Sequence, residues 1–428
     1  MSTVLGVPLP NSWSAAPVKH VTSMLNRGSA PDYVDVGPVR AISQASNQAS
    51  GLDWSRTRFH DFSGNAKNLK GHLRPNDVLI NSTGTGTLGR IGYFTGSPDG
   101  LPCMADSHVT IARAKPDELD ARFSYYWLSS RPFQEYVYAA LVVGATNQIE
   151  LNRDRLGDAP VPLPPLEEQR RIAEFLDAET ARIDSLAGLG ERQINLLRER
   201  AEATVAQFFG PGAGRREYRF RHLMESNPCY GVLVPKFSDV GVPLIRVSDL
   251  GRLDHDLERL PRIEEEQAQE YKRTRISPGD LLITVVGATI GRCDVAPPET
   301  AGFNVSRALA RVQLAAGISP QMIASWVRGR DFRIQAELVT SGAAAQPALN
   351  MSDITHFTVW LPETPSGRLD LARRVSTHED ETRRLLSAIE RKQALISERR
   401  QALITAAVTG QFDVSTASGR NVTDGVSA

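Results

Sequence analysis

The stretch "LRPNDVLINSTGTGTLGR" at residues 73–90 returns in altered form as "ISPGDLLITVVGATIGR" at residues 276–292. Both stretches contain a proline, an aspartate two residues later, a short apolar run, a glycine-containing segment and a final Gly-Arg. Asp77 therefore matches Asp280, which lies 203 residues further along the chain. A repeat at this spacing predicts that one structural unit occurs twice.

Other parts of the chain repeat in the same order. Residues 157–186 and 355–386 each place Leu-Pro before a long helical pattern, and these patterns end near Gly210 and Gly410. We therefore expect an α+β protein with two pseudo-repeated mixed α/β domains of about 160 residues, each followed by a helix of about 45 residues.

Three glycines between residues 84 and 89 have the spacing of a dinucleotide-binding fingerprint. That motif needs a helix after the glycine turn, whereas residues 90–100 alternate and then break on Gly and Pro, as a second strand does. The second copy also replaces the middle glycine with Ala288 or Thr289. We therefore predict a turn between two strands, with no cofactor bound by this chain. The predicted turn glycines are Gly84, Gly89, Gly287 and Gly291.

Residues 227–230, "NPCY", resemble in part the Asn-Pro-Pro-Tyr/Phe motif of amino-group DNA methyltransferases. Cys229 replaces the second proline, and neither copy contains a convincing Gly-rich site for S-adenosylmethionine after an N-terminal strand. We interpret the stretch as a turn.

The composition is that of an ordinary globular chain, with 41% hydrophobic and 23% charged residues. No run of about 18 apolar residues and no secretory leader occurs, so we expect a cytoplasmic location. Cys103, Cys229 and Cys293 lie too far apart to indicate disulfides or a zinc site. A formal net charge of zero argues weakly against a surface that coats nucleic acid throughout, but it leaves local basic patches open.

Two long helical patterns carry apolar residues at spacings of three and four, which is typical of a coiled-coil seam. Each seam needs a partner, and we expect the two helices, roughly 60 to 65 Å long, to pair antiparallel. Gly188 and Gly190 predict a weak point or bend in the first helix. The predicted helix-pairing residues are Ile172, Leu176, Ile183, Leu186, Ile194, Leu197, Leu385, Ile389, Ile396 and Leu403.

This organisation, together with "PLPPLEEQRRIAEFLDAETARIDSL" (162–186) and "RRQALITAAVTGQFDV" (399–414), resembles the DNA specificity subunit of a type I restriction-modification system. The resemblance covers nearly the whole chain and implies two target recognition domains separated by two long antiparallel spacer helices that form a coiled coil. The implied segments are domain 1 (1–162), the central helix (163–210), domain 2 (211–362), the C-terminal helix (363–412) and a flexible tail (413–428).

In that family each domain reads one half of a split double-stranded DNA target, and the helices fix the distance between the halves. The resemblance further implies two methyltransferase subunits docked on the helices and, in a restriction enzyme, two ATP-dependent restriction and translocase subunits. It implies no catalytic or metal-binding residue in this chain, with S-adenosylmethionine, ATP and Mg on the partner subunits. The residues agree, because the sequence offers no metal-ligand cluster and no nucleophile and base pair.

Candidate DNA-binding residues follow from the chemistry of base and phosphate contacts, which favours Arg, Lys, Asn, Gln, Ser and Thr. In the first domain they are Arg56, Arg58, Lys67, Lys70, Ser82, Thr83, Thr85, Thr87, Arg90, Asn147 and Gln148. In the second domain they are Lys236, Arg246, Lys272, Arg273, Arg275, Thr289, Arg292, Arg307 and Gln346. We expect the acidic stretch at 264–270 to face away from phosphate, unless it lies on the methyltransferase.

The sequence leaves two other functions open. The chain could be a fused methyltransferase whose catalytic motif has drifted, in which case it would bind the methyl-donor cofactor itself. It could also be a helical scaffold without a DNA role, in which case the assembled complex would show no salt-dependent DNA affinity.

Overall fold

The computed structural model describes residues 3–48, 51–84, 86–144, 149–253, 255, 257–340 and 347–414. The chain divides into two compact units, each with one mixed α/β domain and parts of two long helices. Unit 1 consists of Met1–Leu189 with Lys392–Ala428, and unit 2 of Gly190–Arg391. No helix in these described ranges is long and apolar enough to cross a membrane.

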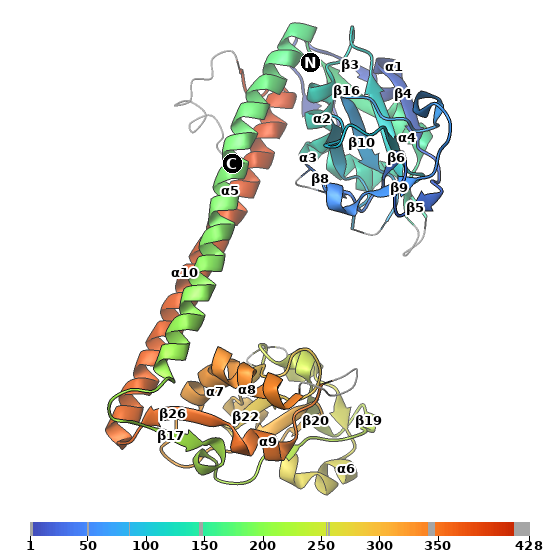
Figure 1. The fold of residues 1–428 in the computed structure, drawn as a ribbon. Helices are drawn as coiled ribbons and strands as arrows, with labels where there is room; N and C mark the ends of the chain where they lie inside the picture. The colour runs from blue at the N-terminus through green and yellow to red at the C-terminus, as the bar shows by residue number, and fades with distance from the viewer. Residues whose placement is uncertain are drawn as a thin grey trace. The chain divides into compact units, whose positions relative to one another are not determined.

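A four-stranded antiparallel sheet lies at the centre of unit 1 (Figure 1). Its strands in spatial order are β11 (Ile91–Phe94), β10 (Asp77–Asn81), β13 (Val109–Ala114) and β4 (Thr22–Arg27). Every residue of β10 is buried, because both faces of this sheet are covered. β10 begins at the repeated aspartate and contains the apolar run that follows it.

A second four-stranded sheet packs beside the first. Its strands are β12 (Cys103–Ala105), β6 (Val39–Ile42), β9 (Arg58–His60) and β5 (Tyr33–Val34), with β12 parallel to β6. Leu79 of β10 and Ile42 of β6 share one buried cluster between the sheets. Four short pairs complete the strands: β1 (Thr3–Val4) with β2 (Val7–Pro8), β3 (Ser14–Pro17) with β16 (Pro160–Leu163), β7 (Asn47–Gln48) with β8 (Gly51–Leu52), and β14 (Val142–Val143) with β15 (Glu150–Leu151).

Helices cover the other face of the central sheet. Val78 and Ile80 point there, opposite to Leu79, because side chains alternate along a strand, and they join one core with Phe123 and Trp127. Asp120 starts the helix that carries both aromatic residues by accepting hydrogen bonds from its first backbone N–H groups. The α-helices of this domain are α1 (Val18–Val21), α2 (Ala121–Ser129), α3 (Arg131–Tyr136) and α4 (Arg153–Asp158).

Unit 2 has the same strand order. Its central sheet contains β23 (Cys293–Val295), β22 (Leu281–Thr284), β25 (Leu309–Val312) and β18 (Cys229–Tyr230). Its second sheet contains β24 (Asn304–Val305), β20 (Val242–Ile245), β21 (Arg262–Ile263) and β19 (Phe237–Ser238), with β24 parallel to β20. β17 (Arg215–Arg219) pairs with β26 (Thr358–Pro362), as β3 does with β16. The predicted repeat of one mixed α/β domain is confirmed.

The remaining helices of unit 2 are α6 (Glu265–Glu270), α7 (Pro320–Arg328), α8 (Arg330–Thr340) and α9 (Met351–His356). One local prediction is wrong, because Cys229 and Tyr230 form the edge strand β18 where we expected a turn. Cys229 lies opposite Arg311 of β25. Backbone pairing with β25 decides the conformation, which Pro228 does not prevent because it lies outside the strand.

A buried ion pair explains the repeated aspartate. In unit 1 Asp77 accepts hydrogen bonds from Nε and Nη2 of Arg113, each at 2.7 Å. In unit 2 Asp280 accepts one from Nε of Arg311 at 2.5 Å. Each arginine also donates a hydrogen bond to a backbone carbonyl oxygen in the segment before the strand. The acceptor is His72 in unit 1 and Arg273 in unit 2. The repeated Asp therefore has a structural role.

The two long helices are α5 (Leu166–Phe208) and α10 (Pro365–Val408). They pair antiparallel within each unit. In unit 1 Arg400 contacts Asp184 at 2.9 Å and Gln393 donates to the carbonyl oxygen of Ala187 at 2.7 Å. In unit 2 the Nε2 atom of His378 lies 3.4 Å from the carbonyl oxygen of Ala201. The falling numbers on α10 against the rising numbers on α5 confirm the predicted direction.

Burial divides the predicted helix-pairing residues into three groups. Ile172, Leu176, Ile183 and Leu403 are buried, and Ile194, Leu197, Ile389 and Ile396 are partly buried. Leu186 and Leu385 are 52% and 53% exposed, so their predicted place in the seam is wrong. The polar contact between Gln393 and Ala187 occupies the pairing face beside Leu186.

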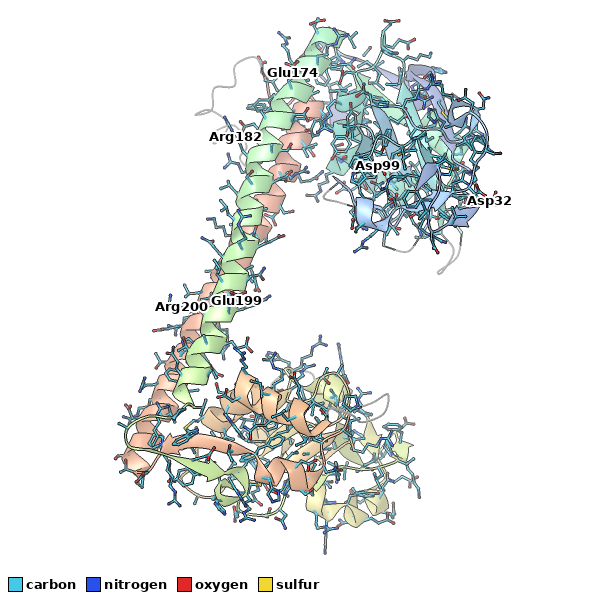
Figure 2. All side chains as sticks on the ribbon, viewed as in Figure 1. Asp32, Asp99, Glu174, Arg182, Glu199 and Arg200 are labelled. Carbon is cyan, nitrogen blue, oxygen red and sulfur yellow. The ribbon has the colours of Figure 1, made fainter. Side chains whose placement is uncertain are left out.

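The glycines of α5 do not interrupt it. Helical structure continues through Gly188 and Gly190, so the predicted weak point is not a break in the helix. The outward side of α5 is highly charged, and Figure 2 shows Glu174, Arg182, Glu199 and Arg200 projecting from it.

Candidate nucleic-acid interface

The predicted glycine turn of unit 1 joins β10 to β11. Gly84 and Gly89 have φ values of +97° and +79°, a region that residues with a Cβ atom rarely adopt. The N–H of Gly89 donates to the carbonyl oxygen of Asn81 at 2.8 Å and so closes the loop. A Cβ atom at Gly84 would lie 2.6 Å from Oε1 of Gln44 and 2.8 Å from the Thr87 hydroxyl, so a larger residue there would require these side chains to move.

Unit 2 builds the same turn between β22 and β23. Gly287 and Gly291 have φ values of +85° and +86°, and the N–H of Gly291 donates to Thr284 at 3.0 Å. Strands, not helices, follow both turns, so no helix N-terminus faces a pyrophosphate here. The prediction of a turn between two strands is confirmed.

Polar side chains surround the turn of unit 1. The Thr83 hydroxyl lies 3.2 Å from Oε1 of Gln44 and 2.8 Å from Nδ1 of His108. Arg90 donates to the carbonyl oxygen of Asn47 and to Oε1 of Gln48, at 3.1 and 2.9 Å. We call residues 43–48, 82–84, 86–90 and 106–108 the turn end of unit 1. Its partly exposed groups are amides, hydroxyls, an imidazole and a guanidinium.

Ser82 lies within the turn end, but its side chain does not reach the surface. Its side chain is fully buried, and its hydroxyl lies 2.5 Å from that of Thr110. Thr87 is partly buried and contacts Gln44 at 3.5 Å. The candidates Thr85, Asn147 and Gln148 lie outside the described residues.

The turn end of unit 2 comprises residues 246–252, 285–292 and 305–308. Arg292 donates to the carbonyl oxygen of Leu250 and is exposed, as are Thr289 and Arg307. Arg246 is exposed and forms an ion pair with Asp249 at 3.1 Å. Arginine therefore dominates here, whereas amides dominate in unit 1. The candidate Gln346 lies outside the described residues.

A second candidate surface lies before the central strand of each unit. In unit 1 this basic segment (residues 67–74) contains the exposed residues Lys67 and Lys70. In unit 2 it comprises residues 272–277, where Lys272 and Arg273 are exposed and Arg275 is paired with Glu265 at 2.9 Å.

The structure does not bring the two surfaces together. The basic segment precedes Asp77 and the turn follows Asn81, so β10 separates them by about 16 Å at roughly 3.3 Å per residue.

Three further candidates occupy other positions. Arg56 pairs with Asp53 at 3.0 Å, and Arg58 stacks over the Tyr33 ring at 3.8 Å from its centroid. Lys236 is exposed, and its backbone N–H donates to Gln267 of α6 at 2.8 Å. The acidic stretch at 264–270 thus packs beside Lys236.

Sequence reasoning missed several residues of these surfaces. Gln44, Gln48 and His108 belong to the turn end of unit 1, and Arg252 to that of unit 2. The signal was present, because residues 43–48 read "SQASNQ", which is dense in side chains able to contact base edges. Its significance depends on the contact with the turn, which is remote in sequence.

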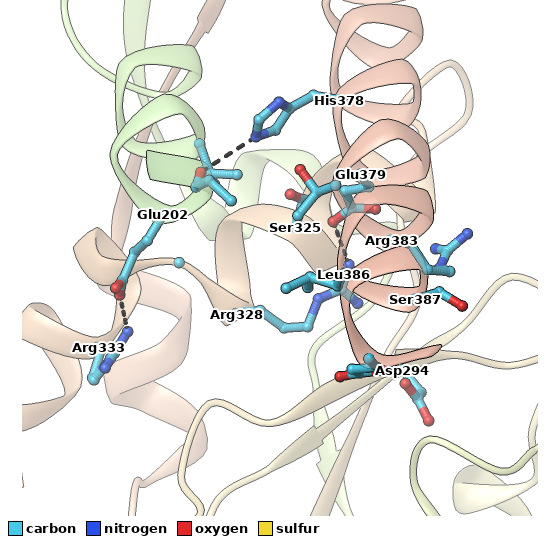
Figure 3. A pocket seen from close by; sticks show the side chains of 15 residues that line it. Glu202, Asp294, Ser325, Arg328, Arg333, His378, Glu379, Arg383, Leu386 and Ser387 are labelled. Carbon is cyan, nitrogen blue, oxygen red and sulfur yellow. Dashed lines mark hydrogen bonds and ion pairs between the residues drawn. The ribbon is translucent and has the colours of Figure 1, made fainter. Parts of the chain in front are cut away.

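A cavity of about 960 Å³ lies in unit 2 between the long helices and α7 (Figure 3). Its charges are compensated within the protein. Arg328 pairs with Glu379 at 2.7 Å, and Arg333 pairs with Glu202. Such a groove does not offer a net positive charge to a nucleic acid or a small anion.

No group of three or more His, Cys, Asp or Glu residues that could hold a metal ion occurs in the described ranges. The three cysteines are free thiols. Burial raises the pKa of Cys103 to about 11 and that of Cys293 to about 12.

Comparison with known proteins gives one consistent result. A family model described as the type I restriction modification DNA specificity domain matches residues 58–192. The specificity subunit of type I restriction enzyme EcoBI from Escherichia coli is 27% identical over 371 residues, 75% of each chain. The EcoKI specificity subunit from Escherichia coli strain K12 is 22% identical over 395 residues, 86% of this chain and 82% of that one.

Solved structures agree in fold. The HsdS subunit from Thermoanaerobacter tengcongensis has a TM-score of 0.53 at 19% identity, covering 96% of this chain and 100% of that one. A chain from a structural study of complex assembly and conformational transition in the type I R-M system has a TM-score of 0.73 at 19% identity, covering 95% and 100%. The family model, the sequence relatives and the fold all support the assignment of this chain as a specificity subunit of a type I restriction-modification system.

Proposed function

We propose that each unit of this specificity subunit reads one half of an asymmetric, bipartite DNA target. One observation carries the proposal: the two units build the same glycine turn but surround it with different side chains. Two domains that share a scaffold but carry different polar groups at one end can recognise two different DNA sequences. A homodimer would instead present identical surfaces and select a palindrome.

The chemistry of the two turn ends supports different half-sites. Gln44 and Gln48 in unit 1 are amides, which pair in bidentate fashion with the N6 and N7 groups of adenine. Arg292 and Arg307 in unit 2 carry guanidinium groups, which pair with the O6 and N7 atoms of guanine. We expect these side chains to exchange their present protein contacts for base edges when DNA binds.

The long helices suit a second role, as a spacer and as a docking surface for two methyltransferase subunits. Besides their charged faces, α5 and α10 expose several leucines that their mutual pairing leaves uncovered. Such side chains suit the core of a protein interface. The exposed leucines are Leu186, Leu189, Leu196, Leu369, Leu385 and Leu395.

The proposal places adenine methylation and ATP-driven cleavage on partner subunits. This chain would bind neither S-adenosylmethionine nor ATP and Mg, and would direct two methyltransferase subunits and, in a restriction complex, two translocase subunits to the target.

Methylation mapping tests the proposal. DNA from cells that co-express this chain with its methyltransferase is sequenced by a long-read method that detects methyladenine, and cells without this chain serve as the control. We expect a split, asymmetric motif only when this chain is present. If an assembled complex with its methyl donor produces no new motif, the targeting role is wrong and a scaffold role takes its place.

A further inference from the structure

A small cavity of about 270 Å³ opens beside the basic segment of unit 1. Lys67, Lys70, His72 and Arg74 line it, together with Arg113 from β13. No carboxylate belongs to its lining. The cavity is large enough for a tetrahedral oxyanion with some of its water and too small for a protein helix, whose diameter with side chains is about 10 to 12 Å.

The positive charge at this cavity is largely uncompensated. Among the described residues, no Asp or Glu oxygen lies within 4.0 Å of the side-chain nitrogens of Lys67, Lys70 or Arg74. Arg113 differs, because Asp77 already neutralises it at 2.7 Å. Three cations therefore surround one hollow in a chain whose formal net charge is zero.

His72 supplies a second observation. Its Nδ1 atom is buried and has no hydrogen-bond partner among the described residues, a state that costs free energy unless a bound group or water satisfies it. Burial, followed by the charges of Arg74 and Arg113, lowers the pKa of His72, while Asp77 opposes the shift and Lys67 adds to it. The positive charges of Lys67, Arg74 and Arg113 therefore influence His72 in the lining of the cavity.

In both units the basic segment is fixed by a hydrogen bond from an arginine of the central sheet. The guanidinium of Arg113 holds the carbonyl oxygen of His72 at 3.1 Å, and in unit 2 Arg311 holds that of Arg273 at 3.0 Å. Both units therefore fix an exposed basic segment to the buried ion pair of the central strand. In unit 2 the segment carries Lys272 and Arg273.

We propose that this cavity binds a phosphate oxyanion, held by Lys67, Lys70 and Arg74, and that its occupant is a backbone phosphate of the DNA whose half-site unit 1 reads. The inference rests on the proposed function for the identity of the DNA. Lysine binds phosphate as a point charge, so the cavity would set the position of the duplex and carry no sequence information.

The test uses the assembled complex with methyltransferase subunits and a duplex containing the mapped motif. The double variant Lys67→Ala/Lys70→Ala is compared with Lys19→Ala/Lys115→Ala, which removes two lysines that already pair with Asp158 and Glu118. DNA affinity is measured across a range of salt concentrations. Log affinity falls as log salt rises, and we expect the cavity variant to reduce the magnitude of this negative slope by about 1. The control should keep the wild-type slope.

Two further readouts define the role. The methylated motif should be the same for wild type and cavity variant, and Lys67→Arg/Lys70→Arg should restore the slope. An unchanged slope in a folded, assembled complex would overturn the inference. So would loss of methyltransferase binding in the cavity variant, because the surface would then dock a protein. If wild type itself yields no motif, the proposed function fails instead.

A second experiment distinguishes free phosphate from a DNA backbone phosphate as the ligand. Inorganic phosphate is titrated without DNA, and the His72 imidazole is followed by NMR. Phosphate binding at the cavity should raise the pKa of His72, because an anion offsets the nearby cations. If phosphate does so while the salt slope of the variant stays at the wild-type value, free phosphate is the ligand and the DNA assignment is wrong.

Discussion

At the scale of the residue, the side chains that repeat between the two copies are those that build the scaffold. Asp77 and Asp280 are buried partners of arginine, and the matched glycines adopt backbone conformations with positive φ. The side chains that differ between the copies surround these fixed points. Repetition therefore identifies the framework, and the proposed recognition of two different half-sites would depend on the side chains that are not repeated.

Replacing Asp77 with Ala should destabilise the chain strongly, by about 3 to 5 kcal/mol, because Arg113 would be left largely buried without a counter-charge. Calorimetric unfolding measures the change. Asp117→Ala is the matched control, since that carboxylate is exposed. Equal unfolding temperatures for both variants would contradict the structural role of the repeated aspartate.

Gly89→Ala and Gly86→Ala separate two reasons for a turn glycine. Both residues have similar φ values, +79° and +83°, so both substitutions carry backbone strain of about 1 to 2 kcal/mol. A Cβ atom at Gly89 would also lie 3.0 Å from Val137, whereas nothing lies within 4 Å at Gly86. We expect the larger loss of stability at Gly89, and equal losses in urea unfolding would refute the packing contribution.

The cysteines should react with iodoacetamide in an order set by burial. Burial raises the pKa of Cys103 to about 11 from a usual value of about 9, so its thiolate fraction at pH 8 falls roughly 100-fold. Burial raises the pKa of Cys293 further, to about 12, while Cys229 is less buried than the other two cysteines. Mass spectrometry should find Cys229 labelled first in the native chain and all three labelled in urea. Native labelling of Cys293 at its urea rate would contradict the packing.

At the scale of the element, the strand, turn and strand at residues 77–94 could be predicted from the sequence. The second copy lacks the middle glycine of the cofactor motif, which argued against a cofactor site. The direction of helix pairing followed from the repeat as well. The exposure of Leu186 and Leu385 could not be predicted, because seam spacing alone does not reveal where a polar contact replaces an apolar one. The burial of Ser82 depends on Thr110, 28 residues away.

Candidate contacts were harder to assign than elements. The basic segment and the glycine turn are neighbours in sequence, yet they lie at opposite ends of a buried strand. Gln44 lies far from the turn in sequence but contacts Thr83 at 3.2 Å. Such proximity arises from the pairing of the sheets, which no local pattern contains.

Substitutions on α10 should distinguish buried from exposed leucines. Leu403→Ala should cost about 2 to 5 kcal/mol, because the side chain is 1% exposed and a cavity would remain. Leu395→Ala, on the same helix and 64% exposed, should change stability by less than about 0.5 kcal/mol. Native-state hydrogen exchange of residues 396–408 reports both values. A small effect at Leu403 would show that helix pairing contributes little there.

At the scale of the whole molecule, the two units are built from separate parts. Each unit has its own sheets, its own buried ion pair and its own turn end. A change at one turn end should therefore alter one half of the target and leave the other half and the spacer unchanged. Loss of a bidentate base contact costs about 1 to 3 kcal/mol of discrimination, enough to relax one position of a half-site.

The most direct measurement maps methylated motifs in cells that carry Gln44→Ala/Gln48→Ala in unit 1 or Arg292→Ala/Arg307→Ala in unit 2, each co-expressed with the methyltransferase. We predict that the first variant relaxes one half of the wild-type motif and the second variant relaxes the other half. Unchanged halves in both variants, or both halves altered by either variant alone, with the complex assembled and active, would contradict the central claim that each unit reads its own half of the target.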